Sequence, residues 1–217
     1  MSLSEIFAHL ANGLLYTILV TLTCSATGLA VGMLVAAAHR LGGRPLQVLT
    51  DIYTYVLRGI PVLVLLFLVY FGLPGFGLKV PPLAAMALSL GLVAGANLAE
   101  VFRGALDAVD PVEILAAQSM GMSRWQIFVY IEMPQMLRFA MPGMVNEFTS
   151  VLKYSPFAYT VGIPEITKEA ITLTGTTLQG TEIYLAVGVL YFAIYRILLV
   201  GVQFIDRMYR VPGIRPV

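Results

Sequence analysis

Residues 115–134 read LAAQSMGMSRWQIFVYIEMP, and this segment between two apolar runs decides how the rest of the chain is interpreted. Just before it, Asp110 is followed by a proline and, three residues on, by Glu113, as in a helix capping box. The pattern predicts a short helix over about 111–120, and capping is favoured for Glu113 over contact with a partner. Gly121 can end this helix because glycine tolerates the left-handed conformation of a helix stop.

Ser123 and Gln126 form a second capping box. This box predicts another short helix, which runs into Ile131. Two helices joined at a glycine make a compact unit over about 110–131, which we call the knob.

Composition indicates a membrane setting. The 217 residues are 59% hydrophobic and 12% charged, against roughly 25% charged in ordinary soluble domains. Mean hydropathy is +0.86. We expect one integral-membrane domain over 1–217, in contact with lipid. A net charge of +1 argues against a nucleic-acid partner. Cys24 is the only cysteine, and no His, Cys, Asp or Glu cluster has the spacing of a metal site.

A helix needs roughly 20 apolar residues to cross a bilayer. Several uncharged runs of the chain are about that long, which predicts an all-α fold of transmembrane helices. Arg58 to Pro61 form a kink or break inside the second span. Asn146 and Glu147 interrupt the fourth, which is weak by hydropathy alone. The five predicted spans are 14–38, 46–72, 80–102, 135–153 and 183–205.

Arginine placement predicts the orientation. Three groups of arginines fall on one side of the membrane if the N-terminus is outside, and the positive-inside rule makes that side cytoplasmic. The C-terminus and the knob are then cytoplasmic. The groups are Arg40 and Arg44; Arg103, Arg124 and Arg138; and Arg207, Arg210 and Arg215.

The chain holds no Gly-x-x-x-x-Gly-Lys-Ser/Thr loop, so we do not expect it to bind ATP phosphates itself. Nor does it show the nucleophile–base pair of a membrane hydrolase. It is therefore expected not to be an enzyme, and no catalytic residue is assigned.

The order Ala116-Ala117, Gly121, Ile131 and Pro134 resembles the cytoplasmic loop by which permease subunits of bacterial ATP-binding-cassette (ABC) importers contact their ATPase. Leu115 stands where that family has glutamate. The resemblance implies a type I ABC importer permease fold with a cytoplasmic coupling-helix loop. The residues expected to couple to the ATPase are Ala116, Ala117, Gly121, Met122, Ser123 and Arg124.

Further motifs are similar to the polar-amino-acid branch of that family. Gly95-Ala-Asn-Leu-Ala-Glu100 with Arg103-Gly104 follows the branch pattern, except that Asn97 stands in place of tyrosine. The resemblance implies that two permease subunits, identical or homologous, form the pore and that two ATPase subunits bind ATP and Mg. An external solute-binding protein would deliver an amino acid. This chain itself would hold no cofactor.

A polar stripe marks the fourth predicted span. At about 100° per residue its members share an arc of about 120°. The stripe can line a water-filled path between two permease subunits. Alternatively, its polar groups can pair with each other through a Glu147–Lys153 network inside one subunit. Its members are Asn146, Glu147, Ser150, Lys153 and Tyr154.

An ion-coupled secondary carrier for a small polar solute is the alternative function. Such carriers usually contain internal repeats. The sequence shows no repeat, which favours the ABC permease.

Overall fold

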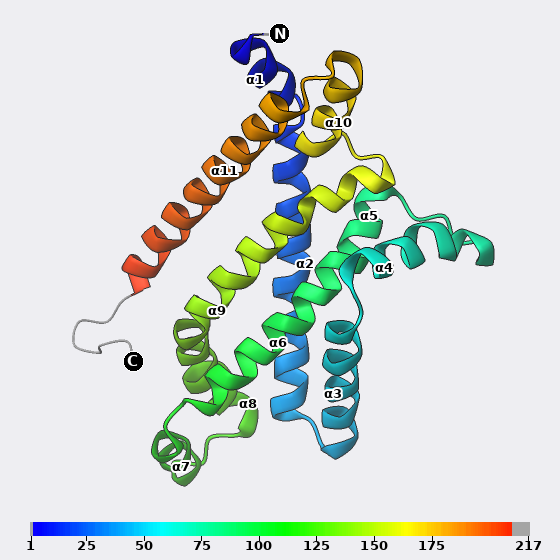
Figure 1. Ribbon diagram of the computed structural model, residues 1–217. Helices are drawn as coiled ribbons and strands as arrows, with labels where there is room; N and C mark the ends of the chain where they lie inside the picture. The colour runs from blue at the N-terminus through cyan, green and yellow to red at the C-terminus, as the bar shows by residue number, and fades with distance from the viewer. Residues whose placement is uncertain (1, 210–217) are drawn as a thin grey trace.

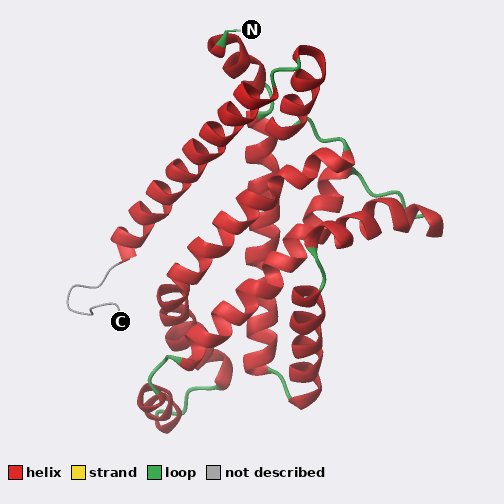
Figure 2. Cartoon of the chain, viewed as in Figure 1, coloured by secondary structure: helices red, strands yellow, loops and turns green. Residues whose placement is uncertain are grey.

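The computed structural model describes residues 2–209, and every regular element in that part of the chain is a helix (Figure 2). The helix α2 (Leu14–Leu41) runs through the middle of the molecule, crossed by α6 (Leu92–Asp107) and α9 (Met133–Tyr154) (Figure 1). The all-α prediction is confirmed. Arg210 and Arg215, which entered the orientation argument, lie outside the described residues.

Within residues 2–209, three helical stretches are long and apolar enough to cross a membrane. The first is α2, and the second is Pro82–Asp107, where α5 (Pro82–Met86), a π-helical turn η3 (Ala87–Gly91) and α6 follow one another. The third is Gly180–Gly201 within α11 (Gly180–Tyr209). These match the predicted spans 14–38, 80–102 and 183–205.

The second predicted span, 46–72, is not one straight helix. It divides into α3 (Arg44–Gly59) and α4 (Val62–Phe67), bent by 101° at the break. Proline at 61 lacks a backbone N–H and restricts the residue before it to extended conformations. Accordingly, Ile60 has φ −97° and ψ 129°. The predicted break is confirmed.

After the break, α4 continues through a π-helical turn η1 (Leu68–Gly72) into a 3₁₀ turn η2 (Leu73–Phe76). If the bent pair is one span, the described residues contain four candidate spans instead of three.

The fourth predicted span, 135–153, lies inside α9, a helix of 22 residues. This helix is long enough to cross a bilayer, but it is not among those that are also apolar enough. Its polar side chains, including Asn146, Glu147 and Lys153, lower its hydropathy. The predicted count of five spans is therefore higher than the three or four candidate spans found among the described residues.

The α2–α6 contact is built on small residues. A Cβ added at Gly28 would lie 2.8 Å from the Cβ of Ala94, and one at Gly32 would lie 2.7 Å from the Cβ of Leu98. From the other side, Gly91 and Gly95 pack equally closely against α2. One Gly-x-x-x-Gly motif lies on α2, and the other runs from the last residue of η3 (Gly91) into α6 (Gly95). Such motifs let two helix backbones approach closely in lipid, where no hydrophobic effect drives helices together.

A side-chain hydrogen bond attaches α3 to the same helix. The hydroxyl of Tyr53 donates to the carbonyl oxygen of Leu92, the residue after the π-helical turn η3, at 2.7 Å. The first half of the broken pair is thereby fixed to the centre of the bundle.

One end of the molecule carries α1 (Leu3–Ala11) and α10 (Ile166–Thr177), and the opposite end carries α7 (Pro111–Ser119) and α8 (Arg124–Ile127) (Figure 1). The residues between the fourth and fifth predicted spans, 155–182, are largely helical. They form a 3₁₀ turn η5 (Ser155–Val161) and α10.

Glu165 fixes the start of α10. Its carboxylate accepts from the backbone N–H groups of Thr167 and Lys168, at 2.8 Å each, and from the hydroxyl of Tyr191 on α11 at 2.7 Å. Glu165 is fully buried.

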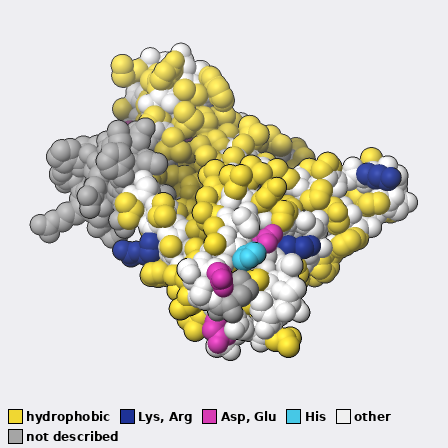
Figure 3. Space-filling view, turned by 90° about the horizontal axis from the view of Figure 1, so that it is seen from above, with side chains coloured by type: hydrophobic (Ala, Val, Ile, Leu, Met, Phe, Trp, Pro, Cys, Tyr) yellow, Lys and Arg dark blue, Asp and Glu magenta, His cyan; other side chains and the backbone are white. Residues whose placement is uncertain are grey.

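The outer surface is apolar. Seen from the end that carries α1 and α10, hydrophobic side chains cover much of the molecule and charged ones are few and scattered (Figure 3). Leu15, Leu22 and Leu34 on α2 and Phe192 and Ile197 on α11 are each more than 60% exposed. So large an apolar surface is typical of contact with lipid or a partner chain.

Candidate functional site

The knob begins as predicted. Asp110 precedes α7, and its carboxylate accepts from the backbone N–H of Val112 at 2.9 Å. The predicted capping role of Glu113, however, is wrong. Its carboxylate instead accepts a hydrogen bond from the side-chain amide of Gln135 at the start of α9. Glu113 therefore attaches the first helix of the knob to the helix that follows it, 22 residues along the chain.

The turn in the knob has the predicted geometry. Gly121 has φ +79°. Its N–H donates to the carbonyl of Gln118 at 2.9 Å, and the N–H of Met122 donates to that of Ala117 at 3.1 Å. This pair of bonds is a Schellman motif, which satisfies the last carbonyls of α7. The left-handed conformation explains why glycine occupies position 121.

The second helix of the knob starts at a complete capping box. The Ser123 hydroxyl accepts from the N–H of Gln126 at 3.3 Å, and the Gln126 side chain accepts from the N–H of Ser123 at 2.8 Å. From there α8 passes through a π-helical turn η4 (Phe128–Glu132) directly into α9. The knob therefore continues without a flexible joint into a helix of the bundle.

The exposed face of the knob is apolar. On α7, α8 and the turn between them, four large apolar side chains are more than half exposed. Ala116, Ser123 and Arg124 are exposed beside them, and Met122 is half-buried. Such a face fits a partner protein better than water. The four side chains are Val112 (68%), Leu115 (60%), Met120 (83%) and Trp125 (62%).

Ala117 lies elsewhere than its predicted role requires. It is only 4% exposed, so it packs inside the knob. Its neighbours Leu115 and Met120 are exposed instead. Leu115 and Met120 are large apolar residues in a segment between two predicted spans, which is the signal in the sequence for an exposed apolar face there.

An ion pair joins the knob to α2. Arg40 donates from Nε and Nη2 to Oε1 of Glu132, at 2.9 and 2.6 Å, and its Nη1 lies 3.7 Å from Oδ1 of Asp107. Asp107 is the last residue of α6 and Glu132 the last of η4. One guanidinium thus touches both chain segments that flank the knob, a role that sequence reasoning did not assign to Arg40.

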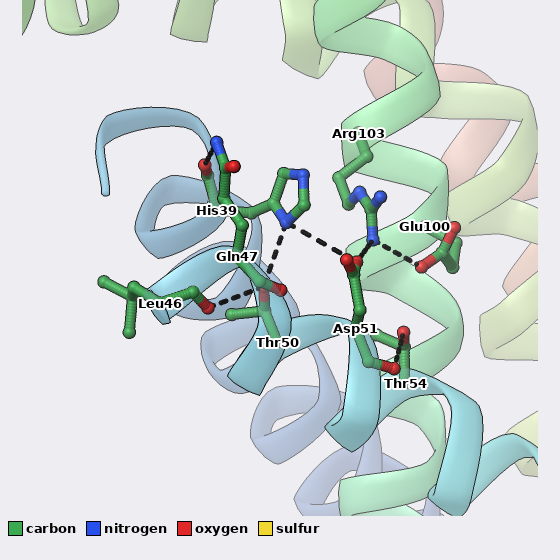
Figure 4. A network of polar contacts seen from close by, with 8 residues as sticks. All are labelled: His39, Leu46, Gln47, Thr50, Asp51, Thr54, Glu100 and Arg103. Carbon is green, nitrogen blue, oxygen red and sulfur yellow. Dashed lines mark hydrogen bonds and ion pairs between the residues drawn. The ribbon is translucent and has the colours of Figure 1, made fainter. Parts of the chain in front are cut away.

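A second polar network lies near the same end (Figure 4). Arg103 on α6 donates to Asp51 on α3 at 2.8 Å and to Glu100 at 3.0 Å. His39 Nδ1 lies 2.9 Å from the Thr50 hydroxyl and 3.7 Å from the Asp51 carboxylate. This network holds α2, α3 and α6 together. A cavity of about 160 Å³ lies beside it, lined in part by His39, Arg40 and Arg103.

The polar stripe of α9 has partners other than the predicted ones. Glu147 accepts from the side-chain amide of Asn97 on α6 at 3.1 Å. The alternative of a direct Glu147–Lys153 pair is not formed, because residues six apart lie nearly two turns apart on a helix and do not face each other. Lys153 Nζ instead lies 5.9 Å from the centre of the Tyr195 ring on α11.

The remaining members of the stripe stay at the surface. Asn146 and Tyr154 are exposed and Ser150 is half-buried. The Ser150 hydroxyl donates to the carbonyl of Asn146 at 2.9 Å, and the Tyr154 ring stacks on Phe157. The stripe is therefore open on one side of α9 and joined to α6 on the other, through Glu147. In the part of the chain that the structure describes, no group of three His, Cys, Asp or Glu side chains is placed to hold a metal.

An all-helical bundle with an apolar surface, candidate membrane spans and an exposed apolar knob at one end is typical of a membrane-embedded protein. The chain belongs to the family of binding-protein-dependent transport system inner membrane components, whose model matches residues 28–211. Members of this family are permease subunits of ABC transporters, and the chain is one of them. This finding replaces the alternative of an ion-coupled carrier.

Individual relatives cover most of the chain. A probable amino-acid ABC transporter permease protein of Bacillus subtilis, YckA, is 29% identical over 205 residues, 94% of this chain and 91% of the relative. The nopaline transport system permease protein NocQ of Agrobacterium fabrum is 35% identical over 196 residues, 84% of this chain and 83% of the relative.

Solved structures have the same fold. A crystal structure of an amino acid ABC transporter with histidines matches with a TM-score of 0.85 at 28% identity, covering 94% of this chain and 96% of that one. An inward-facing MetNI methionine ABC transporter matches with a TM-score of 0.81 at 20% identity, covering 97% of this chain and 100% of that one. The second likeness shows the fold alone.

Proposed function

We propose that this permease subunit belongs to an ATP-driven importer of polar amino acids. The observation that carries the proposal is the knob, a rigid helix–Gly–helix unit with Leu115, Met120 and Trp125 exposed at one end of an apolar bundle. The amino-acid substrate is supported by the names of relatives and of the solved transporter. The chain itself breaks no bonds.

The complete importer is proposed to contain two permease subunits, this chain with a copy or a homologue. Two ATPase subunits bind ATP and Mg and dock on the knobs, and an external solute-binding protein delivers the substrate. The family description, which names binding-protein-dependent transport, supports the last of these partners.

The substrate path is proposed to run along the open side of α9. There, Asn146, Glu147, Ser150, Lys153 and Tyr154 offer both charges and hydrogen-bonding groups within an otherwise apolar bundle. Ionisable groups at membrane depth are costly and by default indicate a pathway or a site. Each subunit would supply half of this path.

The mechanism that follows is alternating access. Closure of the ATPase dimer moves the knob, and the helices continuous with it convert that movement into opening of the path on the other side. In the proposed orientation of the subunit, the knob lies in the cytoplasm and the N-terminus lies outside. The bent α3–α4 pair and α9 then bring the number of spans to five.

Purification of the complex tests the docking. With a tag on this chain, a P-loop ATPase should co-purify, and Leu115→Asp should remove it by placing a charge on the apolar face. Leu178→Asp is the matched control, because Leu178 is 88% exposed but lies in the turn after α10, at the opposite end. Loss of the ATPase in both variants, or in neither, would count against docking on the knob.

Thiol labelling tests the orientation. Cys24 is fully buried, and Cys24→Ser gives a background without other cysteines. A cysteine at exposed Thr176 should react with an impermeant reagent outside intact cells, and one at Ser119 in the knob should not. The reverse pattern would overturn the proposed orientation.

A further inference from the structure

We infer that Arg40 is a positioning residue that makes the knob and α2 move as one body during ATP-driven transport. This inference rests on the proposed docking of an ATPase on the knob. It adds a connection that neither the knob motif nor the polar stripe contains, from the docking unit to the central helix of the subunit.

The first step is the position of the two carboxylates. Asp107 is the last residue of α6 before the knob, and Glu132 is the last residue of η4 after it. The Arg40 guanidinium lies between them, with bonds of 2.9 and 2.6 Å to Glu132 and a distance of 3.7 Å to Asp107. A side chain on α2 therefore contacts the residues on both sides of the knob in the sequence.

The second step is burial, which makes the two contacts unequal. Glu132 is 4% exposed, whereas the Asp107 side chain is 76% exposed. A buried carboxylate needs its partner, because an uncompensated buried charge is strongly unfavourable. An exposed pair is weakened by solvent and salt. The bond to Glu132 is thus the firm one, and it persists in any state that keeps Glu132 buried.

The third step is the route of the movement. Glu132 lies in the π-helical turn that joins α8 to α9, so force on the knob reaches it without crossing a loop. Phe128 and Met136, on the same side of the knob as Glu132 in the sequence, also pack with Ala36 near the end of α2 in one apolar cluster. Packing alone could hold the segments together, so the test must remove the ion pair and leave the packing.

The variant that does so is Arg40→Met with Glu132→Met. Replacing both members of a buried ion pair by apolar residues is often tolerated, whereas removing one strands the other charge. The matched control is Asp51→Met with Arg103→Met. This pair also joins two helices by a bond of 2.8 Å, but it connects α3 to α6 and does not touch the knob.

The experiment uses the full importer complex in proteoliposomes and measures amino-acid uptake per ATP hydrolysed. In the Arg40–Glu132 double variant, ATPase co-purification and hydrolysis should persist while uptake per ATP falls about tenfold, within the range of mutations that alter coupling. The Asp51–Arg103 double variant should keep the wild-type ratio. Arg40→Lys, which keeps the charge and one donor, should give an intermediate ratio.

Three results would overturn the inference. One is a wild-type ratio in the Arg40–Glu132 double variant, and another is an equal fall in the control pair. The third is loss of assembly in both the double variant and Arg40→Lys, which would make Arg40 a folding residue only. Failure of the proposed function is distinct, since the wild-type complex would then show no ATP-driven uptake at all.

Discussion

Asn97 on α6 donates a hydrogen bond of 3.1 Å to the Glu147 carboxylate on α9. The charge in the polar stripe is therefore held between helices and does not pair with Lys153. On the proposed path, the exposed members of the stripe, Asn146, Lys153 and Tyr154, would face the substrate.

Glu147→Gln tests the proposed path. The glutamine keeps an oxygen that can accept from Asn97, so assembly and ATP hydrolysis should persist. Loss of the negative charge should change the preference between cationic and neutral amino acids, measured as competitive uptake in proteoliposomes. Asn97→Ala is the control, because it removes the interhelical bond, worth roughly 0.6 kcal/mol in membranes, and leaves the charge. Unaltered selectivity in the Gln variant would remove Glu147 from the path.

Gly121→Val tests the turn of the knob. No heavy atom lies within 4 Å of a Cβ added there, so the cost comes from the φ of +79° alone. A β-branched residue in that conformation should destabilise the turn by about 1–3 kcal/mol. ATPase co-purification and uptake should fall while the subunit remains inserted.

Gly104→Val provides the comparison for Gly121. Position 104 has equally open space, but within a helix and without a positive φ. Equal co-purification in the two variants would mean that the left-handed turn is not needed for docking.

Gly32→Leu tests the α2–α6 contact. Its Cβ would lie 2.7 Å from that of Leu98, so the helices must separate. Overpacking of this kind costs about 1–3 kcal/mol, and the unfolding temperature of the purified complex should fall. A leucine at Gly104 on α6 would meet open space, so Gly104→Leu should lower the unfolding temperature much less. Similar melting of both variants would contradict the close helix contact.

Glu165 predicts a pH dependence of stability. Burial raises the pKa of its carboxyl above the ordinary value of 4.5, against the lowering effect of the bonds from Thr167, Tyr191 and Lys168. The native state then keeps this proton to a higher pH than the unfolded chain. Its stabilising contribution is complete below pH 4.5 and is lost as pH rises through the raised pKa.

Thermal melting of the complex across the acidic to neutral range checks this sign. Relative to Glu165→Gln, which cannot lose a proton, wild type should become less stable as pH rises. The comparison with Glu5→Gln should have the opposite sign: relative to that variant, wild type should become more stable as pH rises. The reason is that bonds from Ser2 lower the pKa of Glu5 and favour its charged form. Parallel melting curves for wild type and Glu165→Gln would refute the prediction.

Local features of the fold were predictable from the sequence, because their causes lie within a few residues. The Ser123–Gln126 box, the stop at Gly121 and the break before Pro61 all depend on adjacent backbone groups. The Gly28-x-x-x-Gly32 motif is a further local signal, because two glycines one helical turn apart permit close contact with another helix. The angle of 101° after the break has no such local signal.

Contacts between distant segments could not be predicted in the same way. A helical wheel of α9 places Glu147 and Lys153 on one arc but contains no information on Asn97, 50 residues earlier. The bond of Arg40 to Glu132 spans 92 residues. Glu113 looked like a capping residue because its spacing fits, yet the Gln135 amide provides a better partner in three dimensions.

The most direct test of the central claim is the energy source of uptake. The complex, purified through this chain and reconstituted in proteoliposomes, should accumulate a polar amino acid only with its solute-binding protein on one side and ATP on the knob side. Uptake should survive a protonophore and the removal of ion gradients. Accumulation that follows an imposed ion gradient without ATP would contradict the account.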